Sequence, residues 1–211
     1  MASTSNGQTQ LVTYFNFNDS NTTADLPGLE LTPTIIPSPT NGVSGFTFTS
    51  GTTVNLATGD LTGAGQALTV TGGASLVNNG KSFQFTINTV GLTDLALSYA
   101  TKRSPTGFTT QTLAYSTDGI NFTNFGTVTP TSSFVAYSFD LSAVDSLENQ
   151  TSVTFRYTLM GATNANGNNV FDNIQVTGVP EPSTWVAGIL AVGAVGFTQR
   201  RRFARLAGCT A

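Results

Sequence analysis

The chain has 211 residues, a formal net charge of −3 at pH 7, only 9% charged residues and 10% aromatic residues. It contains no histidine and one cysteine, Cys209, which excludes Ser-His-Asp and Cys-His nucleophile systems, histidine-ligated zinc and an intrachain disulfide. The acidic balance argues against nucleic-acid binding, which needs a basic surface, and the apolar content suits one folded domain.

Residues 1–8 are polar and are expected to be disordered, whereas residues 9–178 form short runs of alternating apolar and polar side chains. Such runs, separated by Gly, Pro, Asn and Asp, predict β-strands joined by turns. Asp118–Gly119 is typical of a hairpin turn, and four prolines exclude a central strand from residues 18–39. The expected strands are 11–17, 43–48, 52–56, 67–71, 82–88, 92–101, 109–116, 121–128, 134–141, 151–160 and 169–177, with room for one helical turn in 140–149.

The number and spacing of these strands predict an all-β domain, namely a two-sheet antiparallel β-sandwich. The order of the elements favours a jelly roll, in which the first and last strands pair. One C-terminal hydrophobic helix is expected to follow this domain. Residues 97–103, 113–122 and 170–176 resemble jelly-roll domains of bacterial surface proteins. Those domains are distantly similar to carbohydrate-binding modules and galactose-binding-like domains.

Two aspartates are candidates for a metal site. Asp172 lies inside the last predicted strand, where a bare buried carboxylate would be costly, and Asp19 follows the first strand. In a jelly roll these two places can be neighbours, and an oxygen cage of both carboxylates and backbone carbonyls would suit a structural Ca²⁺. The alternative is that Asp172 caps a turn or accepts backbone hydrogen bonds. No other cofactor is indicated.

The candidates for ligand binding lie beside the loop at residues 105–107. Lys102, Arg103 and Phe108 offer two charges and an aromatic ring there, although the same residues would suit a solvated loop. Further aromatic residues near predicted loops, which could stack on a sugar, are Tyr99, Tyr115 and Phe122. Alternation favours core packing for the two tyrosines. The scattered acidic residues identify no pair of glycosidase carboxylates.

The C-terminal segment has three successive parts. A proline-rich strip at 179–184 is expected to be stiff and accessible, because proline fixes φ and removes an amide donor. Residues 185–199 are expected to form a transmembrane helix, although a core helix is the alternative, and the basic tail at 200–211 suits the cytoplasmic side. The residues that carry these parts are Val179, Pro180, Glu181, Pro182 and Ser183, then Trp185, Ile189, Leu190 and Phe197, then Arg200, Arg201, Arg202 and Arg205.

This order of parts resembles the PEP-CTERM sorting signal of Gram-negative bacteria. The resemblance implies that an exosortase, a membrane cysteine protease, recognises the segment at the inner membrane and removes the tail. The protein would then be released or passed to the cell surface, often with extracellular polysaccharide. Residues 206–211 depart from the pattern, since such signals usually end near the arginines.

Export also bears on the other end of the chain. Residues 1–8 lack the basic and apolar segments of a signal peptide, so we hypothesise that translation starts upstream and that the mature protein begins near Gln8–Leu11. We therefore predict an exported, non-enzymatic cell-surface or extracellular-matrix protein that is sorted and cleaved through its tail. A secreted carbohydrate-binding module is the first alternative and a small glycoside hydrolase is the second.

Overall fold

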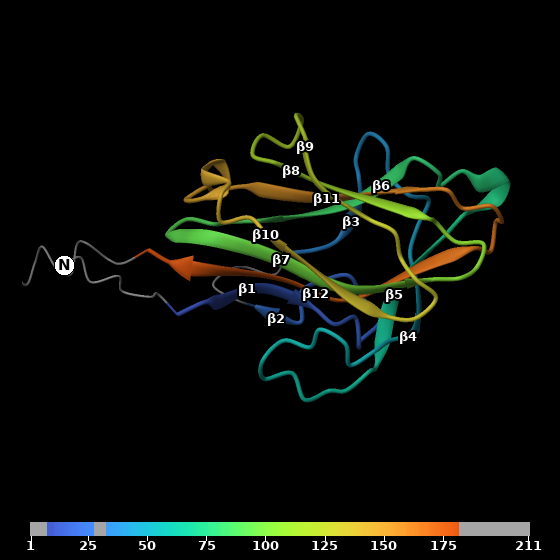
Figure 1. The fold of residues 1–211 in the computed structure, drawn as a ribbon, viewed down its shortest axis with the longest axis horizontal. Coiled ribbons are helices and arrows are strands. Elements are labelled where there is room, and N and C mark those ends of the chain that lie inside the picture. Colours follow the sequence, from blue (N-terminus) through green and yellow to red (C-terminus); the bar gives the residue numbers. More distant parts are fainter. Residues whose placement is uncertain (1–7, 28–32, 182–211) are drawn as a thin grey trace, which may run out of the picture. The chain divides into compact units, whose positions relative to one another are not determined.

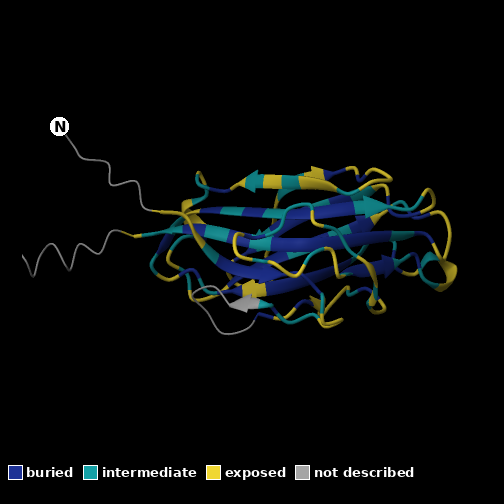
Figure 2. Ribbon diagram, turned by 90° about the horizontal axis from the view of Figure 1, so that it is seen from below, coloured by how far each residue is buried: buried dark blue, intermediate teal, exposed yellow. Residues whose placement is uncertain are grey.

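Alternating side chains build two antiparallel sheets that pack face to face (Figure 1). The structure is a computed structural model that describes residues 8–27 and 33–181, and Gln8–Pro180 form one unit within it. Buried residues, dark blue in Figure 2, follow the central strands and fill the space between the sheets. The predicted all-β sandwich of jelly-roll type is therefore confirmed.

The first sheet has seven strands and the second has five. The first contains, in order, β10 (Val135–Asp140), β7 (Leu92–Arg103), β12 (Asn168–Pro180), β1 (Gln10–Phe15) and β2 (Leu26–Pro27), and β5 (Gln66–Thr71) connects β12 to β4 (Thr47–Ser50). The second contains β3 (Ile36–Pro37), β6 (Lys81–Ile87), β11 (Val153–Met160), β8 (Thr110–Ser116) and β9 (Thr123–Val128). The helical elements of the described residues are two 3₁₀ turns, Ala74–Leu76 and Asp145–Leu147.

The last strand, β12, organises the seven-stranded sheet. It pairs with β7 on one side, and on the other side it pairs first with β5 and then with β1. The first and last strands are therefore neighbours, as predicted. Since strands flank β12 on both sides, most of its residues are buried.

Aromatic rings form the centre of the core. Phe83 of β6 stacks on Tyr157 of β11 with ring centroids 4.9 Å apart, and it meets Phe171 of β12 edge-on at 5.0 Å. Aromatic pairs prefer these offset and edge-on arrangements because of their ring quadrupoles. The hydroxyl of Tyr99 in β7 donates to Oε1 of Gln111 in β8 at 2.8 Å, so a buried hydrogen bond also connects the two sheets.

The strand prediction fails in the segment that precedes β5. Residues 52–56 alternate like a strand but form a loop, because their backbone groups bond to side chains of β12 instead of to a neighbouring strand. The strand expected at 43–48 is β4, which begins only at Thr47. The predicted loop at 18–39 contains β2 and β3, two-residue strands that lie at sheet edges, where proline is tolerated.

The last strand extends into the proline-rich strip. Val179 and Pro180 pair with the start of β7, so these two residues belong to the sheet, where both are half-buried. Glu181 is exposed. The helix expected at 185–199 and the basic tail lie outside the described residues. Within residues 8–27 and 33–181, no helix is long and apolar enough to cross a membrane.

Candidate functional site

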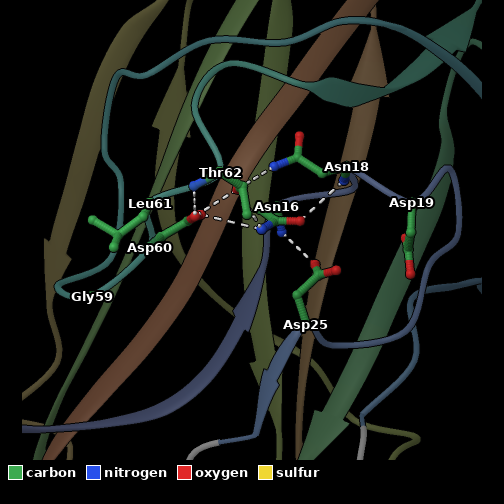
Figure 3. A pocket seen from close by; sticks show the side chains of 8 residues that line it. All are labelled: Asn16, Asn18, Asp19, Asp25, Gly59, Asp60, Leu61 and Thr62. Atoms are coloured by element: carbon green, nitrogen blue, oxygen red, sulfur yellow. Dashed lines mark hydrogen bonds between the residues drawn. The ribbon is translucent and has the colours of Figure 1, made fainter.

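A groove of about 540 Å³ opens where the chain leaves β1 and meets the long loop between β4 and β5 (Figure 3). One wall is the segment that follows β1, and the other is part of loop 51–65. The groove is lined by Asn16, Asn18, Asp19 and Asp25 from the first wall and by Gly59, Asp60, Leu61 and Thr62 from the second.

Two side chains of β12 hold loop 51–65 in place. Asp172 Oδ2 accepts a hydrogen bond from the Thr52 amide at 2.7 Å. Asn173 Nδ2 donates to the carbonyls of Thr52 and Val54 at 2.9 and 2.8 Å. Asn173 has a φ of 50° and lies where the register between β12 and β7 shifts. A bulge of this kind redirects side chains, and here it directs an acceptor and a donor towards the loop.

The loop leaves β4 through Gly51. A Cβ at this position would collide with the carbonyl oxygens of Ala64 and Gln66 and would meet the Asp172 carboxylate. Glycine is therefore required here by the close approach of other backbone. This approach closes the base of the loop, so that its tip presents residues 59–62 to the groove.

Asp60 is the most extensively hydrogen-bonded carboxylate of the groove. Its Oδ1 accepts from the Thr62 amide at 2.8 Å and the Thr62 hydroxyl at 2.6 Å. Its Oδ2 lies 2.8 Å from the Tyr14 hydroxyl and 3.1 Å from Asn16 Nδ2. Burial by itself would raise the pKa of Asp60, but these hydrogen bonds, those of Thr62 foremost, outweigh burial and lower the pKa. Asp60 is therefore an anion at neutral pH.

Asp25 has the opposite electrostatic environment in the same groove. Its Oδ2 accepts from the amides of Asn16 at 2.6 Å and Phe17 at 3.2 Å, which fixes the chain as it leaves β1. Burial raises the pKa of Asp25, and the charges of Asp19 and Asp60 add to this rise, while the two backbone hydrogen bonds oppose it. The groove thus holds one carboxylate with a lowered pKa and one with a raised pKa.

The groove is rich in hydrogen-bond acceptors and carries negative charge. Three aspartates and two asparagines line it, and no lysine or arginine is among the described residues of the lining. The side chain of Leu61 is 95% exposed at the rim. Carboxylates accept hydrogen bonds and donate none when ionised, so the groove suits a neutral or cationic ligand with several donors, and it disfavours an anion.

The structure gives the two predicted metal ligands separate environments. Asp19 is exposed and accepts hydrogen bonds from the amide and side chain of Asn21. Asp172 is 1% exposed, and its oxygens accept from the amides of Thr52 and Asn173 at 2.7 and 2.9 Å. Asp172 thus accepts backbone hydrogen bonds, as in the alternative interpretation. Within the described ranges, no group of three or more Asp, Glu, His or Cys residues is placed to hold a metal. The calcium site stays a prediction.

The residues predicted to form a ligand loop do not converge on a shared surface. Phe108 is fully buried in the core, so its ring cannot contact a ligand in this conformation. The Arg103 guanidinium donates to three carbonyls of the adjoining loops and thereby fixes them. Only Lys102 remains, and its Nζ lies 4.4 Å from the ring centroid of Phe134. Two of the three candidate ligand-binding residues therefore have structural roles, since Phe108 is buried and Arg103 is hydrogen-bonded within the protein.

The other aromatic candidates divide as their alternation suggests. Tyr99 is buried, and half-buried Tyr115 packs against the core with Phe125. Phe122 instead lies over the guanidinium of Arg156, 3.5 Å from the ring centroid to Cζ.

The groove residues Asp25, Asp60 and Thr62 were not predicted from the sequence. Asp25 and Asp60 lie in different loops, and only the folded arrangement of β1 and loop 51–65 brings them to one groove. A local signal existed for Asp60, because an aspartate that bonds the amide two residues later forms an Asx turn. That signal indicates a turn and not a ligand site.

Comparison with known proteins identifies no family. The chain matches no family model and no curated protein. Its structure neighbours are β-sandwich domains similar to carbohydrate-binding modules.

Three of these neighbours illustrate the level of similarity. A xylan-binding domain from Paenibacillus barcinonensis has 13% identity and a TM-score of 0.42, covering 83% of this chain and 97% of that domain. Domain 4 of an extracellular arabinanase from Geobacillus stearothermophilus, in complex with arabinotriose, has 10% identity and a TM-score of 0.47, covering 83% and 95%. An adhesin domain of Lys-gingipain from Porphyromonas gingivalis has 9% identity and a TM-score of 0.47, covering 81% and 99%. Such values transfer no ligand or site to this chain.

The buried carboxyl group of Asp172 should make the free energy of unfolding depend on pH. Burial raises its pKa from 3.8 to about 7, with the charges of Asp60 and Asp25 adding to this and two amide hydrogen bonds opposing it. The folded protein then binds more protons than the unfolded chain between these pH values, so the free energy of unfolding should fall as pH rises from about 5 to 8. One pKa unit corresponds to about 1.4 kcal/mol, so the fall should be at most a few kcal/mol.

Urea unfolding across this pH range measures the effect. Asp172→Asn should flatten the profile, whereas Asp118→Asn should leave it unchanged, because Asp118 is exposed and hydrogen bonds lower its pKa. A wild-type profile that is level or rises between pH 5 and 8 would contradict the buried, protonatable Asp172.

The calcium hypothesis is tested by the melting temperature of the protein in calcium and in chelator. An ion held by Asp19 and Asp172 would raise Tm by binding only the folded state, and Asp19→Asn and Asp172→Asn would each abolish the rise. Asp145→Asn, in the second 3₁₀ turn, is the control. Equal melting temperatures in calcium and chelator would remove the site.

Proposed function

We propose that the sandwich domain is a non-catalytic binding domain for a neutral polysaccharide. The observation that carries this proposal is the groove, in which carboxylate, amide and hydroxyl groups converge beside an exposed leucine. A concave site with a few convergent polar groups is the usual form of a ligand-binding site.

The chemistry of a sugar chain matches this groove. Neighbouring hydroxyl groups of a sugar can donate hydrogen bonds to carboxylate and amide oxygens, and its C–H face can pack on Leu61. The exposed carboxylate of Asp19 can accept from a sugar hydroxyl, whereas Asp60 already accepts four hydrogen bonds and holds the groove wall in place. The same carboxylates would repel uronate or sulfate groups. The groove therefore favours neutral chains over acidic ones.

Hydrolysis of the sugar chain is a second candidate, because two carboxylates with shifted pKa values share the groove. A glycosidase uses one protonated and one ionised carboxyl group, and Asp25 and Asp60 are shifted in these two directions. However, Asp60 uses both oxygens, and Asp25 uses Oδ2, to hold the protein's own backbone and side chains. Binding without turnover is therefore the better-supported function.

A neutral-glycan panel tests the groove. The intact protein should bind at least one of the neutral glucans, xylans, galactans or arabinans, as measured by calorimetry. Asp60→Asn should lower the affinity about tenfold or more, since the groove wall then loses hydrogen bonds to a charged group, each of which contributes roughly 1.5–3 kcal/mol. Leu61→Ala should lower it severalfold through lost apolar contact.

Each variant has a matched control in the β8–β9 turn. Asp118, like Asp60, bonds the amide two residues later, and Ile120, like Leu61, is an exposed apolar side chain at 81%. Asp118→Asn and Ile120→Ala should leave the affinity unchanged. Release of reducing ends, lost in Asp25→Asn, would instead establish the hydrolase, and absence of binding to every neutral chain would refute both functions.

We further propose that the protein is exported to the cell surface or extracellular matrix and is sorted through its C-terminal segment. The support is the order of the proline-rich strip, apolar run and arginine cluster in the sequence. The partners would be an exosortase and, transiently, the inner membrane.

Fractionation with intact-mass measurement tests the sorting proposal in cells with and without exosortase. With the protease, we expect an extracellular or surface form that lacks the tail. Because Val179 and Pro180 are paired within the sheet, its new C-terminus should lie at or beyond Glu181. A full-length protein that stays in the cytosol in both strains would show that the segment is not a sorting signal.

A further inference from the structure

A second polar surface lies on the outer face of the five-stranded sheet. In Figure 1 this sheet is the upper layer, whereas β1 and the loop that follows β4 lie below it. Arg156 of β11 lies at the centre of the sheet, opposite Gln84 of β6 and Ala114 of β8. Its position in the alternation places Arg156 on the outer face, since Phe155 and Tyr157 on either side are in the core.

One of the three guanidinium nitrogens of Arg156 is buried without a hydrogen-bond acceptor. Its buried Nε has no hydrogen-bond partner among the described residues. The Phe122 ring, from the β8–β9 loop, lies 3.5 Å from Cζ. This cation–π contact stabilises the charge and fixes the plane of the guanidinium, but an aromatic face is only a weak acceptor. Burial lowers the pKa of Arg156, yet arginine keeps its charge in proteins.

The sheet around Arg156 offers hydroxyl groups and no opposite charge. Gln84 and Ala114, its two cross-strand neighbours, are neutral. Thr86, Thr112 and Thr158 face the same side by register, and they are partly or fully exposed. The surface therefore combines one charged donor group, one aromatic ring and a row of hydroxyls.

We propose that Arg156 and Phe122 form a second binding site, which takes the carboxylate of an acidic polysaccharide. A guanidinium presents parallel N–H groups that match a planar carboxylate, and Phe122 holds them in one orientation. The threonine hydroxyls bind hydroxyl groups of the flanking sugars. Gln84 and Ala114 beside Arg156 are buried, so a chain would lie along the more exposed Thr86, Thr112 and Thr158.

This site is independent of the neutral-glycan groove in charge and in place. The groove contains aspartates and repels uronate, whereas Arg156 attracts it. The groove is built by segments that follow β1 and β4 of the seven-stranded sheet, whereas Arg156 belongs to the five-stranded sheet. One molecule can therefore hold a neutral chain on one side and an acidic chain on the other.

Titration of the intact protein with oligogalacturonate, and with the same oligomer after reduction of its carboxyl groups, tests the site. At about 0.15 M salt, where long-range repulsion is screened, the protein should bind the acidic oligomer and not the reduced one. Arg156→Gln should lower the affinity about tenfold or more. Arg156→Lys should lower it less, because an ammonium keeps the charge but loses the paired geometry. Phe122→Leu should weaken binding severalfold.

Two controls separate this site from the others. Lys102→Gln removes the other cation that lies over an aromatic ring, and it should leave oligogalacturonate binding unchanged. Asp60→Asn, in the groove, should also leave it unchanged, so failure of the neutral-glycan proposal does not affect this result. Thermal melting checks each variant, and Arg156→Lys decides the outcome if Arg156→Gln does not fold. Equal binding of the two oligomers, no binding by the wild type, or loss only in Lys102→Gln would overturn the proposal.

Discussion

The hydrogen bonds from Asp172 and Asn173 to loop 51–65 are the contact on which the candidate site depends. The loop has no strand partner along residues 52–56, yet its backbone groups still require partners when they are covered. A bulge in β12 supplies them, with a carboxylate for an amide and an amide for two carbonyls. The bulge in β12 therefore helps to place Asp60, Leu61 and Thr62, together with the bonds from Tyr14 and Asn16 to Asp60.

The hydrogen bonds to loop 51–65 require the carboxyl group of Asp172 to be buried, which destabilises its charged form. Asp172 is buried, and Asp60 and Asp25 are close enough to raise its pKa further. Its protonation therefore couples attachment of the loop to pH, while Asp60 at the surface stays ionised because several donors surround it. Burial raises the pKa of Asp172, whereas hydrogen bonds lower the pKa of Asp60. The two carboxyl groups therefore differ in protonation at the same pH.

The two polar surfaces differ because they are built from different parts of the sandwich. The groove is made by two loops, whose aspartates and asparagines bond to the backbone and side chains of the protein itself. The outer sheet face is made by regular strands, where register alone decides that threonines surround Arg156. The two surfaces therefore differ in charge, with aspartates in the groove and an arginine on the outer sheet face.

The sequence by itself determined the fold class, the strands at 82–88 and 151–160, the hairpin turn at Asp118–Gly119 and the burial of Tyr99, because alternation and turn chemistry are local properties of the chain. The candidate site was not local. Asp25, Asp60 and Asp172 belong to three separate segments. Their positions depend on strand pairing, on the bulge in β12 and on the loop at 52–56, whose sequence alternates like that of a strand. Phe108 shows the reverse case, since a loop aromatic that looked accessible fills the core. Only the tertiary structure decided these points, because hydrogen bonds between residues far apart in the chain leave no periodic signal.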